Sequence, residues 1–209
     1  MQGENVWDNL GVSRETLGLL RDFSEQLEKW SRSINLIAPS TVSDLWHRHI
    51  LDSAQLAMFA PEGMTCWCDL GSGGGLPGIV LSIIFRSRDG LSFTLIESDK
   101  RKAAFLKIMI ARYGLHARVF DARIEDVPPV RCDVISARAL APLVELLPLI
   151  RRHLRQDGVA ILPKGRGYDS EVETARKRWH FDLEERESVV DDDSKLLIIR
   201  HIEQRDETK

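Results

Sequence analysis

A glycine-rich stretch in the middle of the chain constrains the fold more than any other feature. It reads Asp-Leu-Gly-Ser-Gly-Gly-Gly-Leu-Pro-Gly over residues 69–78 and continues a short apolar run at 65–70. Glycines permit tight turns and let backbone N–H groups approach a ligand closely. Pro77 suits the first turn of a helix, where its missing N–H is not needed. A strand, a glycine loop and a helix in this order predict a nucleotide-binding cradle.

Short apolar runs alternate with helical patterns from residue 63 onward. We expect strands at residues 65–70, 92–97, 117–121, 133–137 and 159–163, with helices at 77–85, 100–113 and 141–154. This alternation is typical of parallel crossovers in a doubly wound α/β sheet. A helix at 170–179 and two adjacent strands at 183–190 and 195–202 predict an antiparallel hairpin at one sheet edge.

The N-terminal part of the chain has a purely helical pattern. Ser13 suits the N-cap of a helix whose apolar residues recur at near-helical spacing as far as Trp30. A second helix is expected at 45–59. We therefore expect an N-terminal helical cap at 1–62 and an α/β domain at 63–209, packed as one compact unit.

The composition excludes several classes of protein. Apolar residues make up 43% of the 209 residues, which is enough for one substantial core. The formal net charge of −3 predicts that any nucleic-acid binding comes from a local basic patch. The N-terminus lacks a signal-peptide pattern, and the apolar run at 78–85 is too short to cross a bilayer. We expect a cytoplasmic monomer without membrane contact.

Two classes of ligand compete for the glycine loop. Gly73, Gly75 and Gly78 match the G-x-G-x-x-G spacing of enzymes that bind NAD or flavin dinucleotides. The other register starts with Asp69 at the strand end and continues with Gly71. An acid there is unfavourable beside a pyrophosphate but suits the ammonium and sulfonium groups of S-adenosylmethionine. We favour the methyl donor, and a nicotinamide- or flavin-dependent oxidoreductase is the alternative.

The ends of the next strands supply further candidates. Glu97 lies about 20 residues past the loop, where an acid meets ribose hydroxyls in such folds. After the third strand, Glu125 or the backbone could bond the adenine, although an ordinary polar loop fits equally well. Arg138 follows the fourth strand in the same crevice. We interpret it as a functional cation, with a structural ion pair as the alternative.

The expected active site lacks several catalytic groups. The fourth strand does not end in the Asn/Asp-Pro-Pro-aromatic signature that is common in enzymes methylating exocyclic amino groups. Cys132 begins its strand, at the wrong end for a nucleophile, and Cys66 and Cys68 share one strand face, so all three are expected to be core thiols. Guanine N7 carries a free lone pair, so its methylation needs alignment rather than a general base.

Basic side chains and a histidine segment complete the set of candidates. The residues expected to contact RNA phosphates are Arg101, Lys102, Arg123, Lys164 and Arg166. Solvated helix faces are the alternative for each of them. His47 and His49 diverge on a helix and do not chelate a metal, whereas His49 and Asp52 can face together and anchor the region beside the glycine loop.

Three motifs in a fixed order carry a family resemblance. They are Arg-His-Ile-Leu-Asp-Ser at 48–53, Leu-Pro-Gly at 76–78 and Ser-Ala-Arg-Ala at 136–139. With them, the chain from about residue 17 to 202 resembles the RsmG (GidB) family of bacterial 16S ribosomal RNA guanine-N7 methyltransferases. The resemblance implies a class I S-adenosylmethionine-dependent methyltransferase fold, which is Rossmann-like with a mostly parallel seven-stranded sheet.

The resemblance also implies a site and a substrate. It implies donor contacts at Gly71, Leu76, Ile124, Glu125 and Arg138. Together with the loop and strand-end residues, the candidate donor-binding set is Asp69, Gly71, Ser72, Gly73, Gly75, Leu76, Glu97, Ile124, Glu125 and Arg138. Arg138 is also the catalytic candidate, and no metal is expected. The implied acceptor is a guanine in the 530 loop of 16S ribosomal RNA, within the small subunit or an assembly intermediate. A non-catalytic RNA-binding assembly factor is a further alternative.

Overall fold

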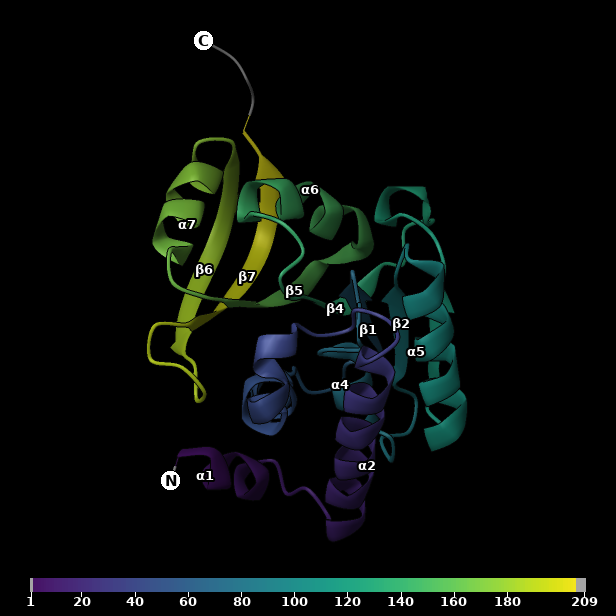
Figure 1. Cartoon of the computed structure of the whole chain (residues 1–209). Helices are drawn as coiled ribbons and strands as arrows, with labels where there is room; N and C mark the ends of the chain where they lie inside the picture. Colours follow the sequence, from purple (N-terminus) through teal and green to yellow (C-terminus); the bar gives the residue numbers. More distant parts are fainter. Residues whose placement is uncertain (1, 206–209) are drawn as a thin grey trace.

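A seven-stranded sheet runs through the centre of the protein in a computed structural model that describes residues 2–205 (Figure 1). The strands are β1 (Cys66–Leu70), β2 (Ser92–Ile96), β3 (Ala117–Phe120), β4 (Cys132–Ala137), β5 (Leu154–Lys164), β6 (Trp179–Glu187) and β7 (Lys195–Gln204). Their spatial order is β3-β2-β1-β4-β5-β7-β6. β1 to β5 are parallel, and β7 is antiparallel to both β5 and β6. The predicted doubly wound sheet with a C-terminal hairpin is confirmed.

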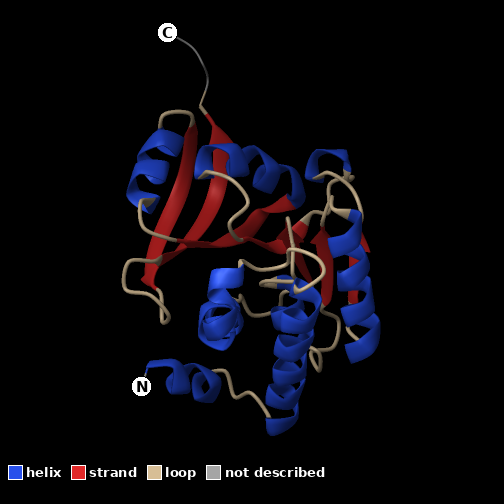
Figure 2. Cartoon of the chain, in the orientation of Figure 1, coloured by secondary structure: helices blue, strands red, loops and turns tan. Residues whose placement is uncertain are grey.

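Helices cover both faces of this sheet (Figure 2). The α-helices of the described residues are α1 (Gln2–Asn9), α2 (Arg14–Ser31), α3 (Asp52–Ala54), α4 (Gly78–Ile84), α5 (Lys100–Tyr113), α6 (Leu143–His153) and α7 (Tyr168–Arg176), and α1 lies apart from the sheet (Figure 1). α2 begins where predicted, because the Ser13 hydroxyl accepts the N–H of Thr16 at 3.1 Å. α5 begins after Asp99, whose carboxylate accepts the N–H groups of Arg101 and Lys102.

Side-chain alternation along the strands divides the core between the two faces. On β1, Trp67 belongs to one buried cluster and Cys68 to the other, and on β5 Val159 and Ala160 alternate in the same way. α2, α4 and α5 pack on the Trp67 face, whereas α6 and α7 pack on the Cys68 face. Both faces are covered, which explains why these strands read as nearly continuous apolar runs.

The N-terminal segment shares its core with the sheet domain. The rings of Phe23 on α2 and Phe105 on α5 stack with centroids 6.4 Å apart. Beside them, the carboxylate of Asp22 accepts two hydrogen bonds of 2.8 Å from Arg112 and one of 2.7 Å from the hydroxyl of Tyr113. α2 is therefore fixed to α5 by both apolar packing and a bidentate ion pair.

The segment expected as one helix at 45–59 contains three helical forms. A π-helical turn at Trp46–Leu51 leads into α3, and a 3₁₀ turn follows at Gln55–Phe59. Another 3₁₀ turn at Pro39–Asp44 precedes them. π-helical turns are rare and occur often at functional sites. This turn carries Arg48 and His49, which reach the candidate site described below.

Other boundaries differ from the expectation for physical reasons. β6 begins at Trp179, several residues earlier than predicted, and residues 179–183 alternate apolar and polar side chains as expected of an edge strand with one packed face. The prediction assigned the start of this alternation to the preceding helix. α7 accordingly ends at Arg176, before the predicted 179. β5 begins directly after α6, at Leu154 rather than at 159. α1 was not predicted. No helix within residues 2–205 is both long and apolar enough to cross a membrane.

The carboxylate of Asp133 joins the beginnings of β1 and β4. Its Oδ2 accepts the backbone N–H groups of Thr65 and Cys66 and the Thr65 hydroxyl, and Oδ1 pairs with Arg155. Burial alone would raise the pKa of Asp133, but the hydrogen bonds from Thr65 and Cys66 and the charge of Arg155 hold it below its ordinary value. A carboxyl group whose pKa is lower in the folded than in the unfolded state stabilises the fold at pH values above its unfolded-state pKa. This contribution is lost as the pH falls through the folded-state pKa.

We therefore expect Asp133→Asn to lower the free energy of unfolding at pH 7 by about 2 kcal/mol. The variant should also lose less stability than the parent as the pH falls below about 4. Denaturant unfolding across this range checks both effects. Asp157→Asn is the control, because Asp157 also pairs with Arg155 but its side chain is 76% exposed. A pH dependence identical to the parent's would contradict the role assigned to Asp133.

Candidate functional site

The candidate site lies at the carboxyl ends of β1 and β4, where the strand order reverses direction. In doubly wound sheets the crevice at this point binds ligands. Two adjoining cavities of about 930 and 670 Å³ open there. Residues Arg138, Ala139, Leu140 and Ala141 line both of them. The segment that follows β4 therefore forms a shared wall between the first and the second cavity.

The first cavity brings together most of the predicted donor-binding residues. Those that line it are Gly71, Ser72, Gly73, Leu76, Glu97, Ile124, Glu125 and Arg138. Four segments that are distant in sequence supply them, namely the loop after β1 and the ends of β2, β3 and β4. Asp69 and Gly75 do not line the cavity. A Cβ on Gly75 would lie 2.5 Å from the Ile79 side chain, so this glycine serves close packing under the loop.

Asp69 lies beneath the glycine loop, where it is 1% exposed. Its Oδ1 accepts the Ser136 hydroxyl at 2.7 Å, and its Oδ2 accepts the N–H of Gly78 at 3.2 Å. Burial raises the pKa of Asp69 to about 6, and these hydrogen bonds oppose that rise. The expectation that this carboxylate faces a cationic ligand does not match its place in the fold. Asp69 instead ties the two ends of the glycine loop to β4.

Glu97 is held at the rim of the first cavity by backbone donors. Its Oε2 accepts the N–H of Gly73 at 2.8 Å, and its Oε1 accepts the N–H of Asp99 at 2.7 Å. Each carboxylate oxygen has a second lone pair. These lone pairs are suited to accept hydrogen bonds from two vicinal hydroxyl groups of a ligand, as the sequence predicts for a ribose.

The glycine loop and the shared wall touch at one point. A Cβ on Gly71, which has φ of +65°, would lie 2.6 Å from the Leu140 side chain. Ala139, one residue earlier in the wall, has φ of +50°, an uncommon conformation for a residue with a Cβ. Leu140 is 38% exposed. Only a glycine at position 71 lets this apolar side chain lie against the loop between the two cavities.

The guanidinium of Arg138 contacts the N-terminal segment. Nη1 donates to Asp52 Oδ2 at 3.1 Å and to the carbonyl of Arg48 at 3.3 Å, while Nη2 lies 3.1 Å from His49 Nδ1. Since a guanidinium can only donate, this histidine nitrogen accepts. The other nitrogen, Nε2, then donates to the Thr41 hydroxyl at 2.8 Å. Arg138 thus forms a structural ion pair and also lines both cavities.

Charge and burial fix the protonation of these partners. Burial lowers the pKa of His49 to about 4, and the positive charges of Arg138 and Arg48 act in the same direction. The imidazole is therefore neutral near pH 7. Burial raises the pKa of Asp52, whereas the charge and hydrogen bond of Arg138 oppose this rise. His49 and Asp52, which were expected to face together, both contact the guanidinium of Arg138.

The second cavity is lined by four cations, Arg48, Arg138, Lys164 and Lys195, and by two carboxylates, Asp52 and Glu171. Lys164 contacts Glu171 at 2.7 Å, and Arg138 and Lys195 are also paired with carboxylates. Arg48 forms no ion pair within the described part of the chain. It is exposed at the cavity rim. An anion that enters this cavity would therefore meet one unpaired guanidinium and three further cations.

The predicted RNA-binding residues fall into three places. Lys102 and Arg123 line the first cavity, and Lys164 lines the second. Arg101 and Arg166 are exposed and lie outside both cavities.

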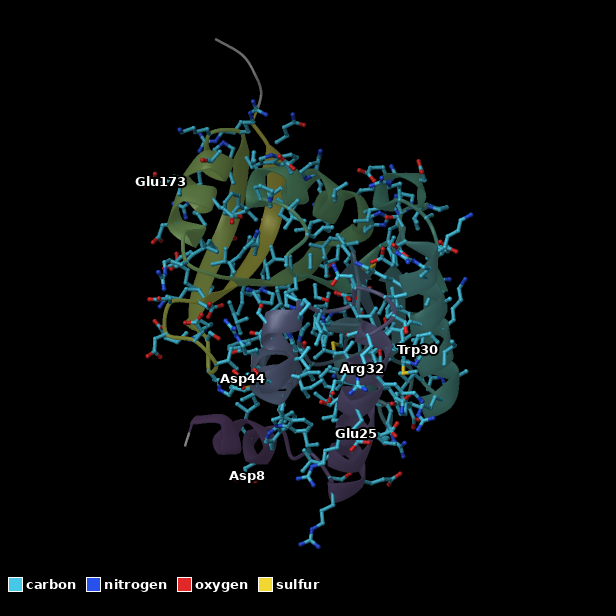
Figure 3. The ribbon with its side chains drawn as sticks, in the orientation of Figure 1. Asp8, Glu25, Trp30, Arg32, Asp44 and Glu173 are labelled. Carbon is cyan, nitrogen blue, oxygen red and sulfur yellow. The ribbon has the colours of Figure 1, made fainter. Side chains whose placement is uncertain are left out.

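Figure 3 shows that the labelled acids Glu25 and Glu173 lie on the outer parts of α2 and α7.

Several side chains at the site were not predicted from the sequence. Gln55 Nε2 donates to Asp52 Oδ1 at 2.8 Å, and Gln55 Oε1 accepts the N–H of Val189 at 3.0 Å. Gln55 and Val189 are 134 residues apart. Glu171 reaches the second cavity from α7. The contacts that bring these two side chains to the site include long-range ones, from Gln55 to Val189 and from Glu171 to the N–H of Leu143, which no local pattern predicts. The described residues contain no cluster of three or more potential metal ligands.

Comparisons with known sequences agree with this architecture. A sequence model of the family described as rRNA small subunit methyltransferase G (GidB) matches residues 16–202. The ribosomal RNA small subunit methyltransferase G of a Ruegeria species is 48% identical over 195 residues, covering 93% of this chain and 95% of the relative. The protein of the same name from Bartonella tribocorum is 46% identical over 194 residues, with coverage of 91% and 90%.

Solved structures show the same fold at low sequence identity. A ribosomal protein L11 methylase from Lactobacillus delbrueckii superposes with a TM-score of 0.59 at 19% identity, covering 74% of this chain and 79% of that one. A SAM-dependent methyltransferase from Aquifex aeolicus gives a TM-score of 0.56 at 14% identity, with coverage of 84% and 96%. The chain has the class I S-adenosylmethionine-dependent methyltransferase fold.

Proposed function

This chain belongs to the rRNA small subunit methyltransferase G (RsmG, GidB) family, and from that premise we propose that it methylates N7 of a guanine in the 530 loop of 16S ribosomal RNA. S-adenosylmethionine is the proposed donor. The observation that carries the proposal is the pair of adjoining cavities, which meet at the wall formed by residues Arg138 to Ala141. One cavity suits the donor and the other suits a nucleotide.

The first cavity fits S-adenosylmethionine in size and polarity. A volume of about 930 Å³ lies within the range of small-molecule sites. Glu97 would accept the ribose hydroxyls, and Ile124 and Glu125 would contact the adenine. Asp69 would act indirectly, by holding the loop. When bound there, S-adenosylmethionine supplies a methyl group activated by a sulfonium.

The second cavity fits a nucleotide of the RNA. Arg48 and Lys195 at its rim are suited to phosphate oxygens. Lys102 and Arg123 extend the cationic surface past the first cavity. These local cations would attract RNA despite the net charge of −3 of the chain. The same attraction predicts that binding weakens as the salt concentration rises.

The state of the titratable groups in the second cavity supports N7 as the acceptor atom. Asp52 and Glu171 are paired with Arg138 and Lys164, and the accepting nitrogen of His49 is occupied by Arg138. These groups are therefore not free to take a proton from a substrate. Guanine N7 has no proton to lose, so alignment and exclusion of water can supply the rate enhancement.

Arg138 would orient the acceptor base. A guanidinium has five N–H donors, and Asp52, His49 and the Arg48 carbonyl use three of them. The remaining donors can bond guanine O6. A contact to O6 alone would leave the N7 lone pair free to attack the methyl carbon while the bond from that carbon to the sulfonium sulfur breaks, so donor and acceptor would have to meet where the two cavities adjoin.

The test is transfer of labelled methyl groups from S-adenosylmethionine to small ribosomal subunits that lack native base methylation. We expect label on a single guanine, recovered as 7-methylguanosine. Label on another atom or nucleotide would overturn the N7 assignment. RNA binding without transfer would favour a non-catalytic assembly factor, and a bound-cofactor absorbance spectrum would favour an oxidoreductase.

A further inference from the structure

His153, the last residue of α6, lies fully buried between two points of one backbone segment. The N–H of Val130 donates to His153 Nδ1 at 3.3 Å, and His153 Nε2 lies 3.0 Å from the carbonyl of Ile124. Because a backbone amide only donates and a carbonyl only accepts, the imidazole is neutral and carries its hydrogen on Nε2. A protonated ring would direct an N–H at the N–H of Val130.

The neighbouring residue holds the middle of the same segment. Arg152 Nε and Nη2 donate to the carbonyl of Val127 at 3.4 and 3.2 Å. The end of α6 therefore holds residues 124–130 at both ends and in the middle. The side chains of Ile124 and Val127 are buried in the adjacent core. This leaves the segment little freedom to shift as a unit.

The beginning of this segment lines the first cavity. Ile124 and Glu125, together with Arg123 and Ala122, line that cavity. α6 also lines it directly, through side chains such as Pro148. α6 thus forms part of the cavity wall. Its last two residues, Arg152 and His153, also hold the neighbouring part of the wall, which begins at Ile124.

We propose that His153 is a positioning residue for the methyl donor. It holds the carbonyl of Ile124, and with it the backbone that would meet the adenine. The inference rests on the proposed function, because it takes the first cavity as the donor site. His153 does not line the cavity and would touch neither donor nor acceptor. Burial and the charge of Arg152 lower the pKa of His153, which is consistent with a permanently neutral ring.

Two conservative variants separate its two hydrogen bonds. Glutamine can place an amide nitrogen near the Nε2 position and keep the bond to Ile124, whereas asparagine can keep only the bond to Val130. We expect His153→Leu to weaken S-adenosylmethionine binding about tenfold, measured as Kd by calorimetry. His153→Gln should stay within about threefold of the parent, and His153→Asn should resemble His153→Leu.

The control is Ile199→Ala on β7, which opens the same core but lies outside both cavities. Donor KM should rise in His153→Leu while the KM for the ribosomal substrate stays unchanged, and Ile199→Ala should raise neither. Equal losses of donor affinity in Ile199→Ala and His153→Leu, or no recovery in His153→Gln, would overturn the positioning role. Absence of donor binding by the unaltered protein would overturn the proposed function as well.

Discussion

Gly73→Asp is expected to weaken S-adenosylmethionine binding by about 100-fold or more. The Gly73 N–H donates to Glu97 Oε2 at 2.8 Å, so an added carboxylate would enter the first cavity close to the carboxylate of Glu97. Two like charges in a partly buried site repel strongly and also desolvate each other. The Cβ itself has room, since its nearest neighbour would be the Gly71 carbonyl at 3.8 Å.

Gly73→Asn separates the effect of the added negative charge on donor binding from the effect of the added side-chain volume. Asparagine is nearly isosteric with aspartate, and both tolerate the left-handed conformation that φ of +54° requires. We expect Gly73→Asn to retain donor affinity within about tenfold of the parent. Calorimetric titration measures both variants, and thermal unfolding verifies that each is folded. Equal weakening in the two variants would assign the effect to shape, and parental affinity in Gly73→Asp would mean that the donor does not contact this loop.

The sheet could be predicted because its signals are local. β1, β2 and β4 are short apolar runs buried on both faces, and α5 starts at a capping aspartate where the pattern changes to a helical period. The segment at 45–59 has no local sequence pattern that distinguishes π-helical, α-helical and 3₁₀ turns. The form that each of its turns adopts depends on packing against α2 and α4 rather than on its own residues.

The site could be predicted as a set of strand ends but not as a set of contacts. Parallel strands bring their carboxyl ends to one edge, so the topology places Glu97 and Arg138 together. Whether a strand-end acid faces the ligand or the loop depends on donors elsewhere. Ser136, which is 67 residues away, and the N–H of Gly78, at the far end of the glycine loop, draw Asp69 under the loop. The links from Arg138 to the N-terminal segment are long-range for the same reason.

Arg138→Ala is expected to reduce methyl transfer about 1,000-fold, because it removes the donors that would orient the acceptor at the shared wall. The structure predicts a loss of stability as well. The side chains of Arg138 and Asp52 are only 17% and 14% exposed, and the substitution leaves Asp52 without its cation. Removing one partner of such a pair lowers the free energy of unfolding by about 3 kcal/mol. A loss of both activity and stability in this single variant would therefore not separate the two roles.

The double variant Arg138→Ala/Asp52→Ala separates them. Without Asp52 no unpaired carboxylate remains, so about half of the lost stability should return relative to Arg138→Ala. Transfer should stay at the level of the single variant, since the orienting donors are still missing. Asp52→Asn, which keeps an oxygen that can accept from Arg138, should retain transfer within about tenfold of the parent. Single-turnover transfer and denaturant unfolding measure the two quantities on the same preparations. If transfer returned together with stability in the double variant, the loss in Arg138→Ala would come from the unpaired carboxylate of Asp52, and Arg138 would have no orienting role.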